Sequence, residues 1–433
     1  MKKMTWRAPL LAMMASIAFA GCSESQRATT ETNNNTAVNN INPDADTVTT
    51  ETNANLVLPA PDTTHQVEKR SKTIGWPAGK MPVAPAGFTV SKFAGDLKHP
   101  RRMYVAPNKD IFVVESDDEK KSANRITMFR DTNSDGQPDM REVFMTDLKQ
   151  PYGMLVMNGY FYVANTDGIM RYPYKEEQTK ITAKGEKILT LPAGGYNHHW
   201  TRNLIASPDG SKIYVSVGSA SNVGEYGMDE EKRRANILEI NPDGSGERIF
   251  ASGLRNPVGM DWQPGTTTLW AAVNERDELG DELVPDYLTS VQEGAFYGWP
   301  YAYFGQNVDP RRKGERPDLV QKTLVPDVPL GAHTSSLGLE FYNGNRFPAK
   351  YRNGAFVGQH GSWNRSSFSG YKVVFVPFQS GKPGKYEDFL TGFIADAEKN
   401  EVYGRPAGVA ELPDGSLLVA DDEGNTVWRI AAQ

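Results

Sequence analysis

Short apolar runs separated by polar turns fill the chain from about residue 85 to its end. The runs are rich in Val, Ile, Phe and Tyr, and clusters of Gly, Pro, Asn and Asp divide them. The three- and four-residue spacing that marks an amphipathic helix is weak here. This pattern predicts an all-β domain, because short β-rich runs bounded by turn residues are typical of strands.

One phrase recurs six times: a turn, a short apolar run, a second turn and a second apolar run. The copies begin at Pro100, Pro151, Arg202, Pro257, Leu337 and Pro406, and their second runs begin at Ile111, Phe161, Ile213, Leu269, Ala355 and Leu417. The copies follow one another at roughly 50 residues, with longer intervals around 278–335 and 343–404. A repeat of this length predicts a six-bladed β-propeller in which each copy is one four-stranded blade.

The two ends of the repeat region predict how the ring closes. Residues 87–93 form a strand-like run that we expect to complete the last blade beside residues 426–430. A pair of β-sandwiches is the competing architecture, but it does not explain the repeat. In a propeller, the loops around one end of the central channel are where a ligand binds.

Charge and cysteine content narrow the functional classes. The 47 basic and 53 acidic residues give a formal charge of −6, so there is no basic surplus to neutralise the phosphates of a nucleic acid. The single cysteine, Cys22, excludes internal disulfides, zinc sites built from several cysteines and a catalytic Cys in the folded body.

The N-terminus predicts an exported protein. Basic residues precede an apolar run over residues 8–20, which is too short to span a bilayer, and Gly21 and Cys22 follow it. We interpret residues 1–21 as a lipoprotein-type signal peptide and Cys22 as the lipidated N-terminus, with a plain signal peptide as the alternative. The protein is then periplasmic or lipid-anchored to a bacterial membrane facing the periplasm, and it touches the membrane only through the anchor.

The segment that follows the signal is rich in Thr and Asn and poor in large apolar residues. Such a segment cannot bury enough surface to offset the entropy of ordering it. We therefore predict a disordered tether over residues 22–80 and a catalytic propeller domain over residues 81–433.

The strongest local motif is a calcium-loop pattern over residues 131–142. Acidic or amide side chains stand at alternate positions, a Gly occupies the sixth position and a Glu the twelfth. The predicted ligands of a structural calcium are Asp131, Asn133, Asp135, Gln137, Asp139 and Glu142. The alternative is an acidic turn without a metal.

Two further motifs carry candidate chemistry. His198 and His199 precede the third copy of the repeat, and adjacent imidazoles on an extended chain point in different directions, so one of them is the candidate base. Arg255 and Asn256 directly precede the fourth copy, where they offer donors to a carboxylate or quinone oxygen. The alternative for Arg255 is an ion pair or hydrogen bonds that tie neighbouring blades together.

These motifs, taken in order with the later Gly280-Asp281-Glu282-Leu283 and Tyr297-Gly298-Trp299-Pro300, resemble the glucose/sorbosone dehydrogenase family. Its members are soluble or periplasmic six-bladed propellers that use pyrroloquinoline quinone (PQQ) and calcium. The resemblance covers roughly residues 85–431, and the sequence is most similar to the sorbosone-dehydrogenase-like branch. It implies a PQQ-dependent oxidoreductase that oxidises an aldose sugar or a related polyol or aldehyde.

The resemblance also implies roles for individual residues. His199 would be the general base, Arg255 would stabilise charge on the quinone oxygen, and main-chain oxygens around Arg276 and Asp277 would hold the cofactor calcium. The implied cofactor-binding residues are Asn256, Trp363, Arg365, Arg405 and Gln150.

The sequence departs from the family pattern before the catalytic His, where the best-known glucose-oxidising members have an acidic residue and this chain has His198. The implied partners are a small-molecule sugar or polyol and an electron acceptor that no motif identifies. A calcium-dependent propeller lactonase or hydrolase and a non-catalytic carbohydrate-binding propeller are the alternative functions.

Overall fold

A computed structural model describes residues 56–64, 67–117 and 122–433, so the predicted signal peptide, Cys22 and the tether up to residue 55 lie outside the described residues. Strands dominate this part of the chain, and its one α-helix is the single turn α1 (Pro317–Val320). The all-β prediction is therefore confirmed. No helix among the described residues is long and apolar enough to cross a membrane.

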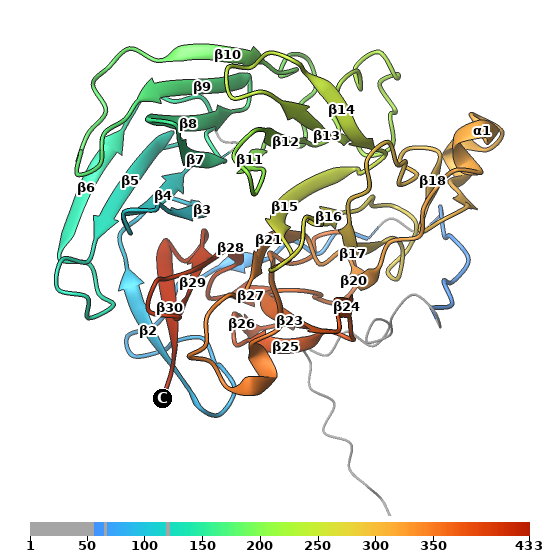
Figure 1. The fold of residues 1–433 in the computed structure, drawn as a ribbon. Coiled ribbons are helices and arrows are strands. Elements are labelled where there is room, and N and C mark those ends of the chain that lie inside the picture. The colour runs from blue at the N-terminus through green and yellow to red at the C-terminus, as the bar shows by residue number, and fades with distance from the viewer. Residues whose placement is uncertain (1–55, 65–66, 118–121) are drawn as a thin grey trace, which may run out of the picture. The chain divides into compact units, whose positions relative to one another are not determined.

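The described strands form six main antiparallel sheets of four or five strands each, with two small sheets beside them (Figure 1). The first sheet holds β3 (Pro100–Val105), β4 (Ile111–Glu115), β5 (Arg125–Arg130) and β6 (Met140–Met145). The second holds β7 (Met154–Met157), β8 (Tyr160–Asn165), β9 (Gly168–Pro173) and β10 (Glu186–Thr190). The third holds β11 (Arg202–Ala206), β12 (Ile213–Val217), β13 (Asn236–Ile240) and β14 (Arg248–Ser252).

The fourth sheet holds β15 (Asn256–Trp262), β16 (Leu269–Asn274), β17 (Pro285–Ser290) and β20 (Val328–Ala332). The fifth holds β21 (Ser336–Phe341), β22 (Gly354–Gln359), β23 (Lys372–Gln379), β24 (Lys382–Pro383) and β25 (Glu387–Leu390). The sixth holds β2 (Phe88–Ala94), β30 (Thr426–Ala432), β29 (Leu417–Asp421) and β28 (Pro406–Glu411). The small sheets are β1 (Lys72–Thr73) with β27 (Glu401–Val402) and β26 (Ile394–Asp396), and β18 (Ala302–Tyr303) with β19 (Asn307–Val308).

Each copy of the predicted repeat forms the innermost strand of one sheet and the strand next to it. The innermost strands β3, β7, β11, β15, β21 and β28 contact one another in that order, and β28 contacts β3 again. The sheets therefore follow each other around a closed ring of inner strands (Figure 1).

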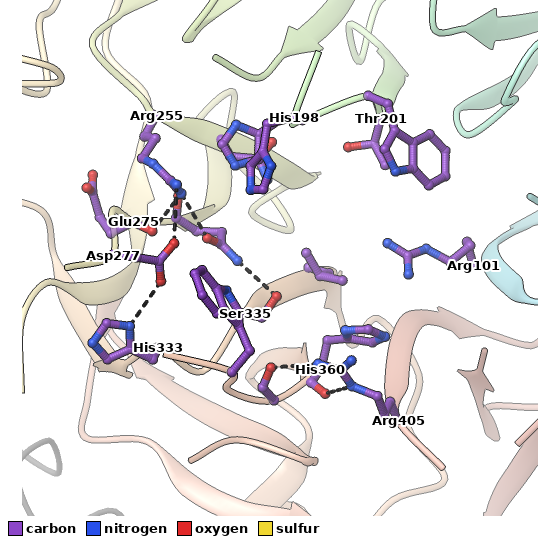
Figure 2. Close-up of a pocket in the computed structure, with 17 residues that line it drawn as sticks. Arg101, His198, Thr201, Arg255, Glu275, Asp277, His333, Ser335, His360 and Arg405 are labelled. Carbon is purple, nitrogen blue, oxygen red and sulfur yellow. Dashed lines mark hydrogen bonds and ion pairs between the residues drawn. The ribbon is translucent and has the colours of Figure 1, made fainter. Parts of the chain in front are cut away.

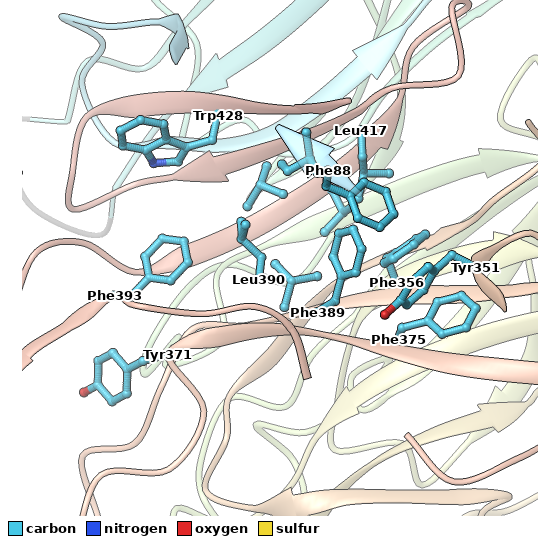
Figure 3. Close-up of a cluster of buried hydrophobic side chains, with 14 of the residues drawn as sticks. Phe88, Tyr351, Phe356, Tyr371, Phe375, Phe389, Leu390, Phe393, Leu417 and Trp428 are labelled. Carbon is cyan, nitrogen blue, oxygen red and sulfur yellow. The ribbon is translucent and has the colours of Figure 1, made fainter. Parts of the chain in front are cut away.

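The ring closes through the sixth sheet, where the first long strand pairs with the last. β2 runs antiparallel to β30, with Phe88 opposite Ala432 and Val90 opposite Ile430. The predicted closure by residues 87–93 is confirmed. Figure 3 shows Phe88 and Trp428 of this sheet in the aromatic-rich cluster that the sixth sheet shares with the fifth.

The hydrophobic core is divided among the spaces between successive sheets, and the alternation of side chains explains how. On β16, Leu269, Ala271 and Val273 face the cluster shared with the third sheet, whereas Trp270 and Ala272 face the cluster shared with the fifth. A strand buried on both faces needs apolar residues at consecutive positions. The continuous apolar runs of the repeat follow from this packing.

Glycines in the innermost strands let these strands approach closely near the axis. A Cβ built on Gly338 of β21 would lie 2.3 Å from the carbonyl oxygen of Ala407 on β28. A side chain at this position would force the two strands apart.

The segment before the sheets differs from the prediction. Residues 56–64 and 67–80 belong to the predicted tether, but β1 pairs in parallel with β27, and the Trp76 indole packs on Phe393, Tyr403 and Trp428. The packed domain therefore begins before residue 81, because this segment finds backbone and aromatic partners on the sheets.

Candidate active site

A cavity of about 270 Å³ lies where the innermost strands begin. Four of the six repeats contribute a polar side chain from the residue directly before the inner strand, and a fifth contributes one from the second residue of its inner strand (Figure 2). These residues are Arg101, Thr201, Arg255, Ser335 and Arg405. The same repeat that forms the sheets therefore also positions polar side chains in the wall of the cavity.

His199 is the predicted base, and its hydrogen bonds fix which ring nitrogen carries the proton. Its Nδ1 lies 3.0 Å from the main-chain oxygen of Ser219 and 2.9 Å from the Oγ of the same residue. A carbonyl oxygen only accepts, so Nδ1 donates and Nε2 keeps its lone pair. Nε2 has no hydrogen-bond partner among the described residues, which leaves it available as a proton acceptor.

The surroundings of His199 keep the imidazole neutral. Burial and the positive charge of Arg255 hold the pKa of His199 well below its usual value. His198 packs edge-on against His199 with ring centroids 4.8 Å apart, and it stacks on Tyr196. His198 also lines the cavity, so the pair supplies one buried base and one exposed imidazole.

The Arg255 guanidinium donates its hydrogen bonds to acceptors within the protein. Its Nε donates to the main-chain oxygen of Asn222 at 3.0 Å, Nη1 to that of Glu275 at 2.6 Å, and Nη2 to Asn222 Oδ1 at 3.0 Å and Asp277 Oδ2 at 3.5 Å. Nη1 also reaches Asn274 Oδ1 at 3.2 Å. All five N–H groups therefore have acceptors, so Arg255 presents a charge to the cavity and no spare donor. This is the tie between neighbouring sheets that was the alternative for Arg255.

Asp277 joins Arg255 to His333. The His333 ring donates from Nδ1 to Asp277 Oδ1 at 3.1 Å and from Nε2 to the main-chain oxygen of Gly280 at 2.9 Å. Burial would raise the pKa of Asp277, but the bond to His333 and the charge of Arg255 outweigh burial and lower it. The bond to Asp277 likewise outweighs burial at His333 and raises its pKa. Asp277 is thus a carboxylate held between two cations.

A second histidine lines the cavity from the fifth sheet. His360 donates from Nε2 to both Asp422 oxygens at 2.8 Å, and Arg101 Nη1 pairs with the same carboxylate. Burial, together with the charge of Arg405, lowers the pKa of His360 to about 4. His360 is therefore neutral at pH 7, with the lone pair on Nδ1.

Arg101 and Arg405 differ from Arg255 in having donors to spare. Arg405 gives Nε and Nη2 to the main-chain oxygens of His360 and Gly361 at 2.9 and 2.8 Å, and its Nη1 has no acceptor among the described residues. Arg101 likewise uses only Nη1 in an ion pair with Asp422. Both guanidinium groups line the cavity, where they could bind an anionic ligand.

The structure brings together His199, Arg255, Asn256, Asp277, Trp363 and Arg405, which line one cavity as the sequence predicted. Asn256 Oδ1 is buried there without a partner among the described residues. A ligand that donates a hydrogen bond would satisfy this oxygen.

Two predicted cofactor-binding residues, Gln150 and Arg365, and one predicted calcium residue, Arg276, are not part of the cavity wall. Gln150 donates from Nε2 to the main-chain oxygen of Asp117 at 3.2 Å, and Arg365 pairs with Glu282 at 2.6 Å. Arg276 is buried against Asp309.

Guanidinium groups donate to two main-chain oxygens in the stretch around Arg276 where the cofactor calcium is predicted. Arg276 donates from Nε and Nη2 to the main-chain oxygen of Asp277 at 3.0 and 2.8 Å, and Asn222 Nδ2 donates to it at 3.2 Å. Arg255 occupies the main-chain oxygen of Glu275 in the same stretch. A guanidinium group on these two oxygens disfavours a second cation there, and the calcium site around Arg276 and Asp277 stays a prediction.

The predicted calcium loop forms the turn between β5 and β6. Asp131 accepts hydrogen bonds from the main chain of Ser134 and Gly136, and Glu142 lies on β6 with Oε2 3.9 Å from Lys180 Nζ. Asp139 accepts from Thr132. No group of three or more His, Cys, Asp or Glu side chains is arranged to hold a metal ion in the described parts of the chain. The calcium loop stays a prediction.

Arg101 and His360 line the cavity, although the sequence motifs assigned no role to either residue. Arg101 could have been suspected from the repeat, because it lies next to Pro100 at the start of the first copy, close to where Arg255 and Arg405 lie in their copies. His360 carries no such signal, since its partner Asp422 lies 62 residues away in the sequence.

A family model described as TrAA12-like matches residues 82–433. The chain belongs to the TrAA12-like family. An uncharacterized protein of Borreliella burgdorferi is 32% identical in sequence to this chain, over 65% of this chain and 76% of its own length.

A PQQ-dependent pyranose dehydrogenase of Coprinopsis cinerea is 22% identical over 79% of this chain, and the chain spans only 54% of that relative. The solved holo form of its PQQ domain superposes with a TM-score of 0.67 at 21% identity, covering 83% of this chain and 99% of the domain. The match is thus to the fold of the PQQ domain and leaves the rest of that enzyme uncovered.

Proposed function

We propose that the protein is a PQQ-dependent oxidoreductase that oxidises an aldose sugar or a related polyol or aldehyde. The observation that carries the proposal is the cavity that combines a neutral His199, open at Nε2, with Arg101 and Arg405, which keep unused donors. Membership of the TrAA12-like family and likeness to a PQQ domain support the identity of the cofactor.

The residues of the cavity fit this cofactor. PQQ is flat and carries carboxylates, so it needs cationic partners at its edge and apolar surfaces on its faces. Arg101 and Arg405 would hold the carboxylates, and Trp363 and Leu337 offer apolar surface in the same cavity. The unpartnered Oδ1 of Asn256 would accept a hydrogen bond from the ligand.

The reaction removes two electrons and two protons from the substrate and converts an aldose to its lactone. When bound, the quinone supplies the acceptor for the hydride from the sugar C1. His199 Nε2 would take the proton of the C1 hydroxyl, and Ser219 holds the ring in the tautomer that allows it. Arg255 would act through its charge, which keeps His199 neutral and favours negative charge in the cavity.

We also propose the finer features of the architecture and its location. The six sheets around a closed ring of inner strands support a six-bladed propeller. The apolar run before Cys22 supports export and a lipid anchor facing the periplasm. The sorbosone-dehydrogenase-like branch is proposed on the His-His-Trp sequence that precedes Thr201.

A dye-reduction assay with purified apo-protein tests the function. We expect aldose-dependent reduction of an artificial electron acceptor when PQQ and calcium are supplied, and none with a nicotinamide cofactor instead. Hydrolysis of a lactone without any quinone would show a propeller lactonase. Sugar binding without turnover in all mixtures would show a carbohydrate-binding module.

A further inference from the structure

Residues 67–76, which we name the strap, run along the cavity side of the fifth and sixth sheets. The strap precedes the part of the chain that the family model matches, which begins at residue 82. Its contacts lead to three segments of the cavity wall.

The first contact holds Trp363, which lines the cavity. Lys69 donates its main-chain N–H to the main-chain oxygen of Trp363 at 2.7 Å. The Arg70 guanidinium lies over the Trp363 ring with Cζ 5.3 Å from the centroid, and Lys69 Nζ lies 4.9 Å from the ring centroid of Phe368. The strap thus covers the loop that carries the aromatic wall of the cavity.

The second contact passes through Asn364. Its Nδ2 donates to the main-chain oxygen of Val67 at 2.8 Å, and its Oδ1 accepts from the main-chain N–H of Glu278 at 2.8 Å. Glu278 follows Asp277, whose carboxylate bridges Arg255 and His333. One amide therefore links the strap, the Trp363 loop and the Asp277 loop.

The third contact reaches Arg405. Trp76 donates from Nε1 to Asp421 Oδ2 at 2.6 Å, and the other oxygen of Asp421 accepts the main-chain N–H of Arg405 at 2.8 Å. Asp421 is fully buried, so these bonds are shielded from water. The strap is connected in this way to the third segment of the cavity wall.

We propose that the strap is a positioning element of the cofactor site, and that Asn364 is a positioning residue through which it acts. The strap holds Trp363, Asp277 and Arg405 at the separation that a bound planar ligand requires. The identity of that ligand as PQQ rests on the proposed function, whereas the positioning of the three wall segments does not.

Two variants of the full chain cut the strap from the cavity wall. Lys69→Pro removes the N–H that bonds Trp363, and Asn364→Asp keeps the acceptor for Glu278 but loses the donor to Val67. Lys72→Pro is the matched control, because it removes the strap's main-chain hydrogen bond to Asn400 and the contact of Lys72 Nζ with Glu401, and neither partner is a cavity residue. PQQ affinity by titration and hydrogen exchange of the apo-protein are measured for all of them, with the melting temperature as a check on folding.

We expect Lys69→Pro and Asn364→Asp to weaken PQQ binding by about tenfold, the usual effect of losing one hydrogen bond, and to speed exchange around Glu278 and Trp363. Lys72→Pro should leave both unchanged even if it lowers the melting temperature. Equal PQQ affinity and equal exchange in all variants would overturn the strap proposal. If the wild type binds no PQQ but the exchange difference is found, the strap stands and the proposed function falls.

Discussion

The state of His199 depends on groups contributed by other parts of the chain. Ser219 sets the tautomer through Nδ1, and burial with the nearby charge of Arg255 keeps the ring neutral. A base that is neutral and has its lone pair toward the ligand needs no proton loss before it can act. The Asp277 carboxylate pairs with Arg255 and so balances the positive charge of Arg255 in the cavity.

The first prediction concerns the removal of this base. His199→Asn should lower kcat by about 10²- to 10⁴-fold, the usual contribution of a positioned general base, and leave PQQ affinity nearly unchanged. His198→Asn is the matched control and should have a smaller effect, because His198 is exposed and lacks the bonds to Ser219. A larger loss in the His198 variant would move the base to that residue.

The second prediction concerns pH. Because the pKa of His199 is lowered, the neutral form persists as pH falls through 6.5, and activity is lost only when pH drops through the lowered value. The acid limb of the kcat/KM profile should therefore lie below pH 6.5. A half-point at or above 6.5, measured with substrate and dye that do not titrate in this range, would contradict the account.

Many residues of the site were predictable from the sequence, because they belong to motifs at or near the starts of the repeat copies. His199, Asn256, Trp363 and Arg405 were predicted as the base or as cofactor-binding residues, and they line the cavity. Arg365, Gln150 and Arg276 were not distinguishable from them by residue type, since an exposed Arg and one bound to a carboxylate look the same in a sequence. The partner that decides the role, such as Asp309 for Arg276, is distant along the chain.

At the scale of elements, the glycines of the inner strands are as important as their apolar residues. The third prediction is that Gly338→Ala lowers the free energy of unfolding by about 1–3 kcal/mol, because its Cβ would strike the Ala407 oxygen. Gly194→Ala is the control, since nothing lies within 4 Å of that Cβ position. Denaturant unfolding measures both, and equal stability of the two variants would show that the inner strands can separate at no cost.

The β5–β6 turn carries the fourth prediction, that residues 131–142 bind calcium. Calcium that binds only the folded state raises the melting temperature, so Asp131→Ala and Glu142→Ala should flatten the calcium dependence of melting in protein without PQQ. Asp209→Ala, in an exposed turn of the third sheet, is the control and should keep the wild-type dependence. A calcium-induced shift that is the same in all four proteins would leave only an acidic turn.

The elements themselves were predictable because each repeat copy has a strong apolar signature on two strands. The outer strands are weaker in the sequence, since residues such as those of β6 and β14 are partly exposed. The strap was missed for a different reason: β1 has two residues and Trp76 is a lone aromatic in a polar stretch. Its partners lie 297 and 345 residues away along the chain, a separation that no local sequence pattern reports.

At the scale of the whole molecule, closure of the ring joins the two ends of the domain. β2 completes the sheet of β28 to β30. Next to these strands, Asp422 pairs with Arg101 of the first sheet, and Arg405 donates to the main-chain oxygen of His360 after the fifth sheet's β22. The site therefore depends on residues from nearly every sheet and forms only when the ring is closed. This explains why the ordered set of motifs along the chain carried more information than any single motif.

The fifth prediction tests the central claim, that this cavity binds PQQ and that sugar reduces it there. Apo-protein is mixed anaerobically with one equivalent of PQQ, with calcium present, an aldose is added and the quinone absorbance is followed without any other acceptor. The account predicts one-to-one binding and a single turnover that converts the spectrum from oxidised to reduced quinone, slowed by at least about a hundredfold in His199→Asn. A quinone spectrum that stays oxidised with every aldose, or that is reduced equally fast in the absence of the protein, would contradict it.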